Sequence, residues 1–148
     1  MKQIGFELVA HKSIKNLNIR HAESNQARIL IVLRTIDYSN TTKELLEKII
    51  SATGCNFKSE ISLVLLNERD KVFINDVMTE LKIKEMISFG VKPAELGLNI
   101  SGKNYLPLKL SKLKFLFSED LRKLASDKEA KKLLWQSLQA FFELNETP

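Results

Sequence analysis

The sequence has few of the residues from which disulfides and metal sites are built, and no long apolar run. Its 148 residues include one cysteine, Cys55, and two histidines. A single cysteine forms no internal disulfide, and so small a set of ligands leaves no zinc-type cluster. No apolar run approaches the ~18 residues of a transmembrane helix. We therefore expect a cytoplasmic protein with no metal, cofactor, membrane segment or secretory signal.

Glycine and proline are also scarce, with five and three residues. The two glycine-rich phosphate loops, G-x-x-x-x-G-K-[ST] and G-x-G-x-x-G, are both missing, so nucleotide cradles of these kinds are not supported. His11 and His21 lie in a polar stretch with no plausible catalytic partner beside them in sequence. We expect both histidines to be solvated.

Aliphatic runs alternate with amphipathic stretches along the chain, and its length fits a single domain. Four runs predict buried strands over residues 27–33, 61–66, 86–91 and 113–117. Leucines alternate around Pro107, which is typical of an edge strand because proline cannot donate to a ladder. The order of elements predicts a three-layer α/β/α sandwich with a mainly parallel, four-stranded central sheet.

Capping residues predict where the first two helices begin. Thr41 and Glu44 have the spacing of a capping box, and Gly54 can end that helix in the left-handed conformation. Asp70 is expected to cap the second helix, whose apolar residues extend to Leu81.

The most informative stretch is residues 118–142, which predicts a long C-terminal amphipathic helix. Ser126 and Glu129 have capping-box spacing at its start. Its apolar residues recur three or four apart and are expected to pack on the core. They are Ala130, Leu133, Leu134, Leu138, Phe141 and Phe142. The only tryptophan, Trp135, lies beside this face.

This stretch resembles the C-terminal block of the psi subunit of bacterial DNA polymerase III. The resemblance rests on Ser118-x-x-Leu121-x-x-Leu124, then Ala130-Lys131-x-x-Leu134-Trp135-Gln136. The α/β order upstream agrees with it, whereas the first 27 residues do not match. The resemblance implies a fold similar to uracil-DNA glycosylases and a non-catalytic role on the clamp loader. Its implied partners are clamp-loader or other polymerase III subunits, with a chi-like subunit among the candidates.

In uracil-DNA glycosylases, the loops after the first and last parallel strands carry the chemistry. The resemblance places Asp37 and Tyr38 in the first loop and Ser118 in the last. The first loop lacks the glycine and proline of the family motif, and Phe117 stands where a histidine would stabilise the leaving base. Without that donor a large electrostatic stabilisation is lost. The resemblance therefore implies a vestigial site, with Asp37 as a turn or cap residue.

The net charge of +5 is unevenly placed: residues 1–28 contain five Lys/Arg against two acids, residues 103–135 contain nine against four, and the last thirteen residues are acidic. Lys109, Lys112 and Lys114 are candidates for contacts to nucleic-acid phosphates in a groove. Phe115 and Phe117 share one strand parity, so we expect them in the core rather than as stacking platforms.

Residues 1–26 are a weakly patterned N-terminal arm that precedes the domain at 27–148. Residues 4–8 alternate as in a short strand, and residues 16–26 are expected to be loop. The arm either packs on the domain or becomes ordered on a partner; in the psi family this segment docks on the clamp loader. The candidate partner anchors of the whole chain are Ile4, Phe6, Leu8, Trp135 and Phe142.

Three functions remain open at this point. The first is the psi-like adaptor, which predicts a filled sheet edge. The second is a divergent DNA-repair glycosylase, in which Asp37 positions water and Ser118 contacts a phosphate; it predicts a pocket at the ends of the first and fourth predicted strands. The third is a non-catalytic nucleic-acid-binding module, which predicts a continuous lysine stripe and salt-sensitive binding.

Overall fold

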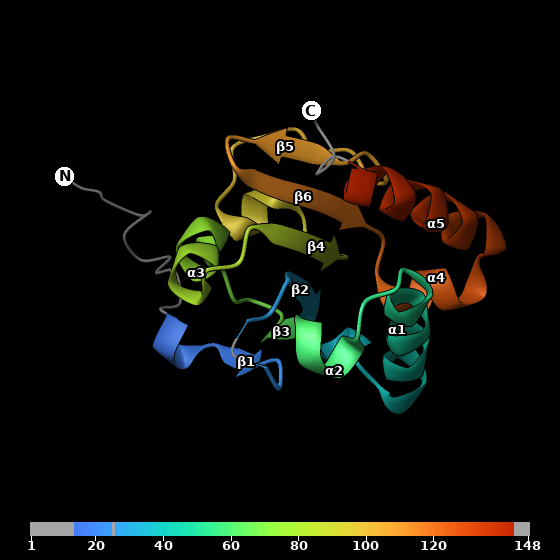
Figure 1. The fold of residues 1–148 in the computed structure, drawn as a ribbon, viewed down its shortest axis with the longest axis horizontal. Coiled ribbons are helices and arrows are strands. Elements are labelled where there is room, and N and C mark those ends of the chain that lie inside the picture. Colours follow the sequence, from blue (N-terminus) through green and yellow to red (C-terminus); the bar gives the residue numbers. More distant parts are fainter. Residues whose placement is uncertain (1–13, 25, 144–148) are drawn as a thin grey trace.

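A computed structural model describes residues 14–24 and 26–143, which form a six-stranded mixed sheet with helices on both faces (Figure 1). The strand order is β1-β3-β2-β4-β6-β5. The strands are β1 (Asn18–Arg20), β2 (Ile29–Arg34), β3 (Ile61–Leu66), β4 (Glu85–Phe89), β5 (Leu108–Leu110) and β6 (Leu113–Ser118). The four central strands are parallel, whereas β1 and β5 pair antiparallel at the two edges.

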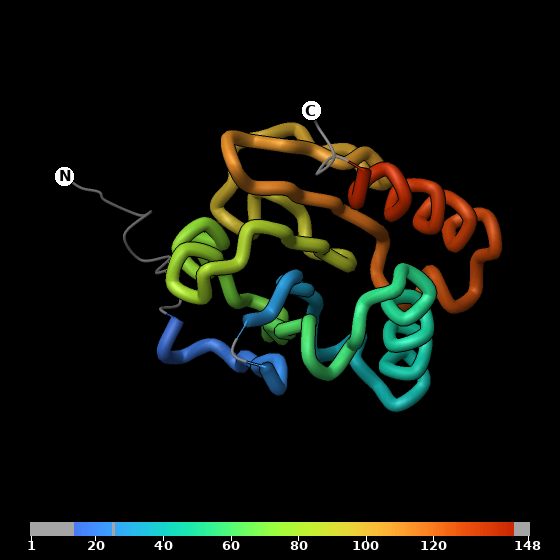
Figure 2. Tube along the Cα trace, viewed as in Figure 1, coloured from blue at the N-terminus to red at the C-terminus, as the bar shows by residue number. Residues whose placement is uncertain are grey.

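The prediction of a four-stranded sheet is therefore wrong in number, although the α/β class is confirmed. The four aliphatic runs do form the parallel centre, and the expected edge strand around Pro107 is β5. The additional strand, β1, lies within the stretch expected to be loop and at the edge opposite β5 (Figure 2). It has three residues, of which Ile19 alone is partly buried. Such a strand is defined by pairing with a distant one, here β3, and leaves no local pattern.

The central strands are buried on both faces, as their continuous aliphatic sequences predict. Alternate residues of β2 enter two separate cores: Ile29 and Ile31 belong to one, Leu30 and Val32 to the other. Helices α1 (Asn40–Ala52), α2 (Phe57–Glu60), α4 (Leu121–Ser126) and α5 (Lys128–Glu143) lie on the first side (Figure 1). Helix α3 (Ile74–Leu81) and the 3-10 turn η4 (Pro93–Leu96) cover the second side. The predicted layering, helices on both faces of one sheet, is present.

Helix α1 is capped two residues earlier than predicted. Ser39 is the N-cap, and it forms a reciprocal capping box with Thr42. The predicted box of Thr41 and Glu44 is wrong because four polar residues in succession can each supply a cap. The box forms between Ser39 and Thr42 because the Thr42 hydroxyl also donates a hydrogen bond to the Asp37 carbonyl oxygen at 2.6 Å, and this bond fixes the turn after β2.

The other two predicted caps are also wrong. Asp70 accepts from the Asn67 backbone N–H at 2.9 Å, in the loop before α3. At α5 the cap is Asp127, whose Oδ1 accepts from the backbone N–H groups of Glu129 and Ala130 at 3.0 and 3.2 Å. Ser126, the predicted cap, instead ends α4.

Phe115 and Phe117 are both buried, as expected from their shared strand parity.

None of the helices within the described ranges combines the length and the apolar character that a membrane crossing requires.

Candidate functional site

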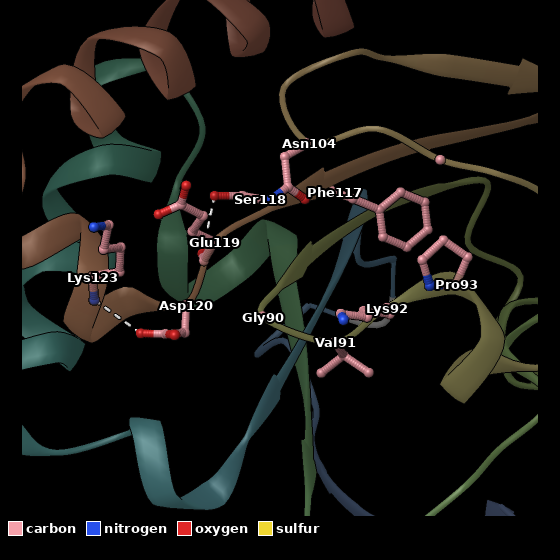
Figure 3. A pocket seen from close by; sticks show the side chains of 11 residues that line it. Gly90, Val91, Lys92, Pro93, Asn104, Phe117, Ser118, Glu119, Asp120 and Lys123 are labelled. Atoms are coloured by element: carbon pink, nitrogen blue, oxygen red, sulfur yellow. Dashed lines mark hydrogen bonds between the residues drawn. The ribbon is translucent and has the colours of Figure 1, made fainter.

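The carboxyl ends of β4 and β6 enclose a hollow of about 530 Å³ (Figure 3). The Phe117 ring and Pro93 lie on one side of it, and Asp120 and Lys123 on the other. The remaining lining residues are Gly90, Val91, Lys92, Gly102, Asn104, Ser118 and Glu119. Open α/β sheets bind ligands at this end of their strands, so the hollow is the first candidate site.

The loops around this hollow are tightly packed at Gly90, which follows β4. Gly90 has a φ of +82°, and its backbone N–H donates to the Ser118 carbonyl oxygen at 2.8 Å. A Cβ at this position would lie 2.8 Å from the Cβ of Asp120. Asp120 in turn accepts from the Lys123 backbone N–H at 2.8 Å and caps α4. The start of α4 is therefore held directly against the end of β4.

Ser118 lines the hollow, but its hydroxyl already has an acceptor. The side chain is buried, and Oγ donates to the Glu119 carbonyl oxygen at 3.0 Å. One carboxylate oxygen of Glu119, Oε2, is buried without a hydrogen-bond partner among the described residues. An acidic residue, Glu119, and an apolar ring, Phe117, thus both line the hollow.

Asp37 lies outside this hollow. Its side chain is 5% exposed at the end of β2, and Oδ1 is 2.8 Å from Nε of Arg122 on α4. The contact is an ion pair without hydrogen-bond geometry. Burial raises the pKa of Asp37, as does the nearby Asp120 charge, whereas Arg122 and Arg34 lower it in part. Asp37 thus joins the end of β2 to α4, the structural role that its turn position suggests.

The predicted vestigial positions are only partly brought together. Tyr38 follows Asp37 and is half-buried against the core, with the Arg20 guanidinium 5.5 Å from its ring centroid. Neither Tyr38 nor Asp37 lines the hollow that Ser118 lines. Strand β4 separates β2 from β6, which places the two strand ends about 10 Å apart.

No cluster of three or more His, Cys, Asp or Glu side chains within residues 14–24 and 26–143 is arranged to hold a metal ion.

Lys109 and Lys112 are exposed on the β5–β6 hairpin, but Lys114 is 1% exposed. Its Nζ donates to the Phe141 carbonyl oxygen at 2.7 Å and lies 3.4 Å from Oε2 of Glu85. The prediction that Lys114 contacts phosphates is therefore wrong. The reason is strand parity: Lys114 has the parity of Leu116, whose side chain lies in the core on the α5 side of the sheet.

A second candidate site lies on the helical side, between α1 and α5. Trp135 is 40% exposed there and stands between two hollows, of about 240 and 400 Å³. We call the smaller hollow the Trp135 groove. Its lining residues are Lys48, Ile49, Ala52, Lys131, Leu134, Trp135 and Leu138.

The larger hollow adjoins this groove and contains the other predicted anchor of α5, Phe142. Phe142 is partly buried, packs edge-on against Phe141 at 5.3 Å and lies under the Arg28 guanidinium at 5.1 Å. Of the two, Trp135 is thus the more available to a partner. The remaining predicted anchors, Ile4, Phe6 and Leu8, lie outside the described residues.

Sequence reasoning predicted Trp135 but not the opposite wall of its groove. Lys48 and Ala52 are one turn apart on α1, and Lys131 and Trp135 are one turn apart on α5. This spacing places each pair on one helix face. The sequence does not show that the two faces meet, because that depends on how α1 and α5 are placed on the sheet.

No protein-family model matches the chain, and no match to it is found among curated proteins.

Proposed function

We propose that this protein is a non-catalytic accessory subunit of a DNA polymerase III assembly, similar to the psi subunit and with a glycosylase-like fold. The observation that carries the proposal is the exposure of Trp135 beside two hollows, in the same block of residues that resembles psi. Tryptophan is the residue type most enriched among the residues that dominate binding energy at protein interfaces.

The carboxyl edge of the sheet supports a role without catalysis. The Asp37 carboxylate is paired with Arg122, and Ser118 lines a hollow that Asp37 does not reach. A group that positions water must lie within hydrogen-bond reach of that water, whereas the Asp37 carboxylate is buried and already engaged by Arg122.

In the proposed mechanism, the sheet and helices form a rigid platform that presents the groove between α1 and α5. Leu134 and Leu138 are buried and line the same groove as Trp135, so the groove has a packed apolar base. A preformed anchor of this kind loses little conformational entropy on binding, which favours affinity. The partner is the clamp loader or another polymerase III subunit.

The test is reconstitution with purified clamp-loader subunits from the same organism, followed by size-exclusion chromatography. We expect the full chain to co-elute with them and Trp135→Ala to reduce the bound fraction. A chain beginning at Ile14 tests the predicted anchors Ile4, Phe6 and Leu8 while keeping β1 in the sheet. If the folded full chain never co-elutes with any polymerase component, the proposal fails.

The hollow with Ser118 on its wall favours a second candidate, a divergent uracil-DNA glycosylase or DNA-binding module. The test is release of uracil from single- and double-stranded DNA, together with retention of DNA at rising salt. We expect no release. Uracil release that Ser118→Ala abolishes would replace the adaptor with the enzyme, and salt-sensitive retention lost in Lys109→Glu/Lys112→Glu would favour the binding module.

A further inference from the structure

We infer that the Trp135 groove binds an amphipathic helix of a partner protein, with a stripe of large apolar side chains flanked by aspartates and glutamates. The inference rests on the docking role proposed above and adds to it the site and the chemistry of the partner. It draws on the shape, the lining and the charge of the groove.

The shape fits a helix lying in a groove. The two walls come from α1 and α5, with Ile49 and Ala52 on one side and Trp135 on the other. Leu134 and Leu138 are buried at its base. Helix-in-groove complexes bury apolar side chains spaced three and four residues apart in such a depression. A volume of about 240 Å³ accommodates a large apolar side chain from the partner, and the adjoining hollow of about 400 Å³ extends the surface along α5.

The charge selects an acidic partner. Lys48 on α1 and Lys131 on α5 line opposite walls, and both are exposed. Neither forms an ion pair within the described part of the chain. The apolar groove is thus flanked by two ammonium groups that remain available to a partner, although Glu44 and Asp127 lie four residues before Lys48 and Lys131 in sequence. Carboxylates on both sides of an apolar stripe complement this pattern, which favours encounter and fixes the orientation of the bound helix.

The same charge argues against a second copy of this chain as the occupant. A two-fold contact through the groove brings Lys48 and Lys131 of one copy close to those of the other. The net charge of +5 adds repulsion between copies. An acidic helix from a different protein avoids both kinds of repulsion.

The test uses the full chain and a phage-displayed library of helical peptides as the probe. We expect selected peptides to have apolar residues at helical spacing with Asp or Glu on both flanks. Trp135 is the only tryptophan, so its fluorescence reports occupancy of the groove when a selected peptide without tryptophan is titrated. We expect a saturable change in emission, and binding that weakens with salt.

Charge-reversal variants make the test specific. Lys48→Glu/Lys131→Glu should weaken binding of the acidic peptide by about tenfold or more, as expected for two rim charge pairs, and should improve binding of a twin peptide with lysines in place of the acids. Lys132→Glu is the matched control: Lys132 is exposed on α5 but does not line the groove. Circular dichroism verifies that each variant is folded.

Three results overturn the inference. They are selection of no peptide, selection of peptides without acidic bias, and equal weakening by Lys132→Glu and by the double reversal. Concentration-dependent dimerisation that the double reversal alters would assign the groove to a second copy instead. If the double variant co-elutes with clamp-loader subunits as fully as the wild type does, the groove inference fails and the adaptor stands. If acidic peptides bind as expected but no polymerase subunit does, the groove stands and the psi-like role fails.

Discussion

The Nζ of Lys114 on β6 donates a hydrogen bond to the carbonyl oxygen of Phe141 in the last turn of α5. The same ammonium lies 4.4 Å from the Phe141 ring centroid and forms an ion pair with Glu85 on β4. Carbonyl groups at a helix C-terminus lack partners within the helix, and a cation there is stabilising. Burial lowers the pKa of Lys114, and Glu85 raises it in part. The C-terminal helix is thus attached to the sheet through one buried charge.

Replacing Lys114 with methionine should therefore destabilise the protein. We expect a loss of about 3 kcal/mol, the lower end of the range for removing one partner of a buried pair, because the Phe141 carbonyl loses its donor and Glu85 keeps the ion pair with the half-exposed Arg28, 3.5 Å away. Urea denaturation measures the change. Lys109→Met, on the exposed edge strand, is the control and should stay within about 0.5 kcal/mol of the wild type.

A double variant without either charge distinguishes the contribution of the ion pair to stability from the contribution of side-chain packing. Lys114→Met/Glu85→Leu should recover only part of the stability lost in the single variant. It removes the buried carboxylate, and buried ion pairs often contribute little over apolar residues of similar size, but the Phe141 carbonyl still lacks its donor. Equal stabilities of the Lys114 and Lys109 variants would contradict the structural role of Lys114.

Asp37 and Asp127 should give pH dependences of opposite sign. The pKa of Asp37 is raised by burial above its usual value, so the folded state binds a proton more tightly than the unfolded state. Its contribution to stability is full below the ordinary Asp pKa and is lost as pH rises through the raised value. The pKa of Asp127 is lowered by its hydrogen bond from the Ala130 backbone N–H. Its contribution is present above the ordinary pKa and is lost as pH falls through the lowered value.

The measurement is the free energy of unfolding from acidic to neutral pH for wild type, Asp37→Asn and Asp127→Asn. Asp37→Asn should remove the loss of stability that occurs as pH rises through the raised pKa of Asp37. Asp127→Asn should remove the loss of stability that occurs as pH falls through the lowered pKa of Asp127. Identical pH profiles for wild type and Asp37→Asn would mean that Arg122 fully compensates the burial of Asp37.

The central parallel strands could be predicted because continuous aliphatic runs indicate burial on both faces. Strand β1 could not, because its three residues acquire their conformation from pairing with β3. The burial of Lys114 has the same origin: a lysine in a strand indicates a solvated face unless a helix covers it, and α5 is distant in sequence. Trp135 was predictable as a residue of interest, whereas its groove depends on the placement of α1.

Caps were the least predictable local feature. Polar residues stand in succession at Ser39–Thr42 and at Ser126–Asp127, and each of them is a competent cap by type. The choice is made by tertiary contacts, such as the hydrogen bond from Thr42 to the Asp37 carbonyl. Such contacts leave no periodic signal in the sequence.

Gly90 and Gly54 provide a matched pair for testing the packing at the carboxyl edge. Both have positive φ, +82° and +90°, which an alanine adopts at a cost of about 1 kcal/mol. At Gly54 a Cβ meets nothing within 4 Å, whereas at Gly90 it meets Asp120 at 2.8 Å. Gly54→Ala should therefore cost about 1 kcal/mol, and Gly90→Ala about 3 kcal/mol because steric overlap adds to the strain. Thermal or urea unfolding measures both. Equal costs would show that Asp120 moves away freely, and that α4 is not held against β4.

Leu138 and Leu133 test which face of α5 packs on the core and which is left for solvent. Leu138 is 1% exposed and forms part of the base of the Trp135 groove. Leu133 is 45% exposed, so the prediction that it packs on the core with the other apolar residues of α5 is wrong. Leu138→Ala should cost about 2–5 kcal/mol, since it removes buried methyl groups and leaves a cavity. Leu133→Ala should change stability by less than about 0.5 kcal/mol, because alanine is a better helix former and little packing is lost. Chemical denaturation gives both values in the same assay. A large cost at Leu133 would mean that α5 is rotated on the sheet, and such a rotation would also displace Trp135 from the groove on which the docking proposal depends.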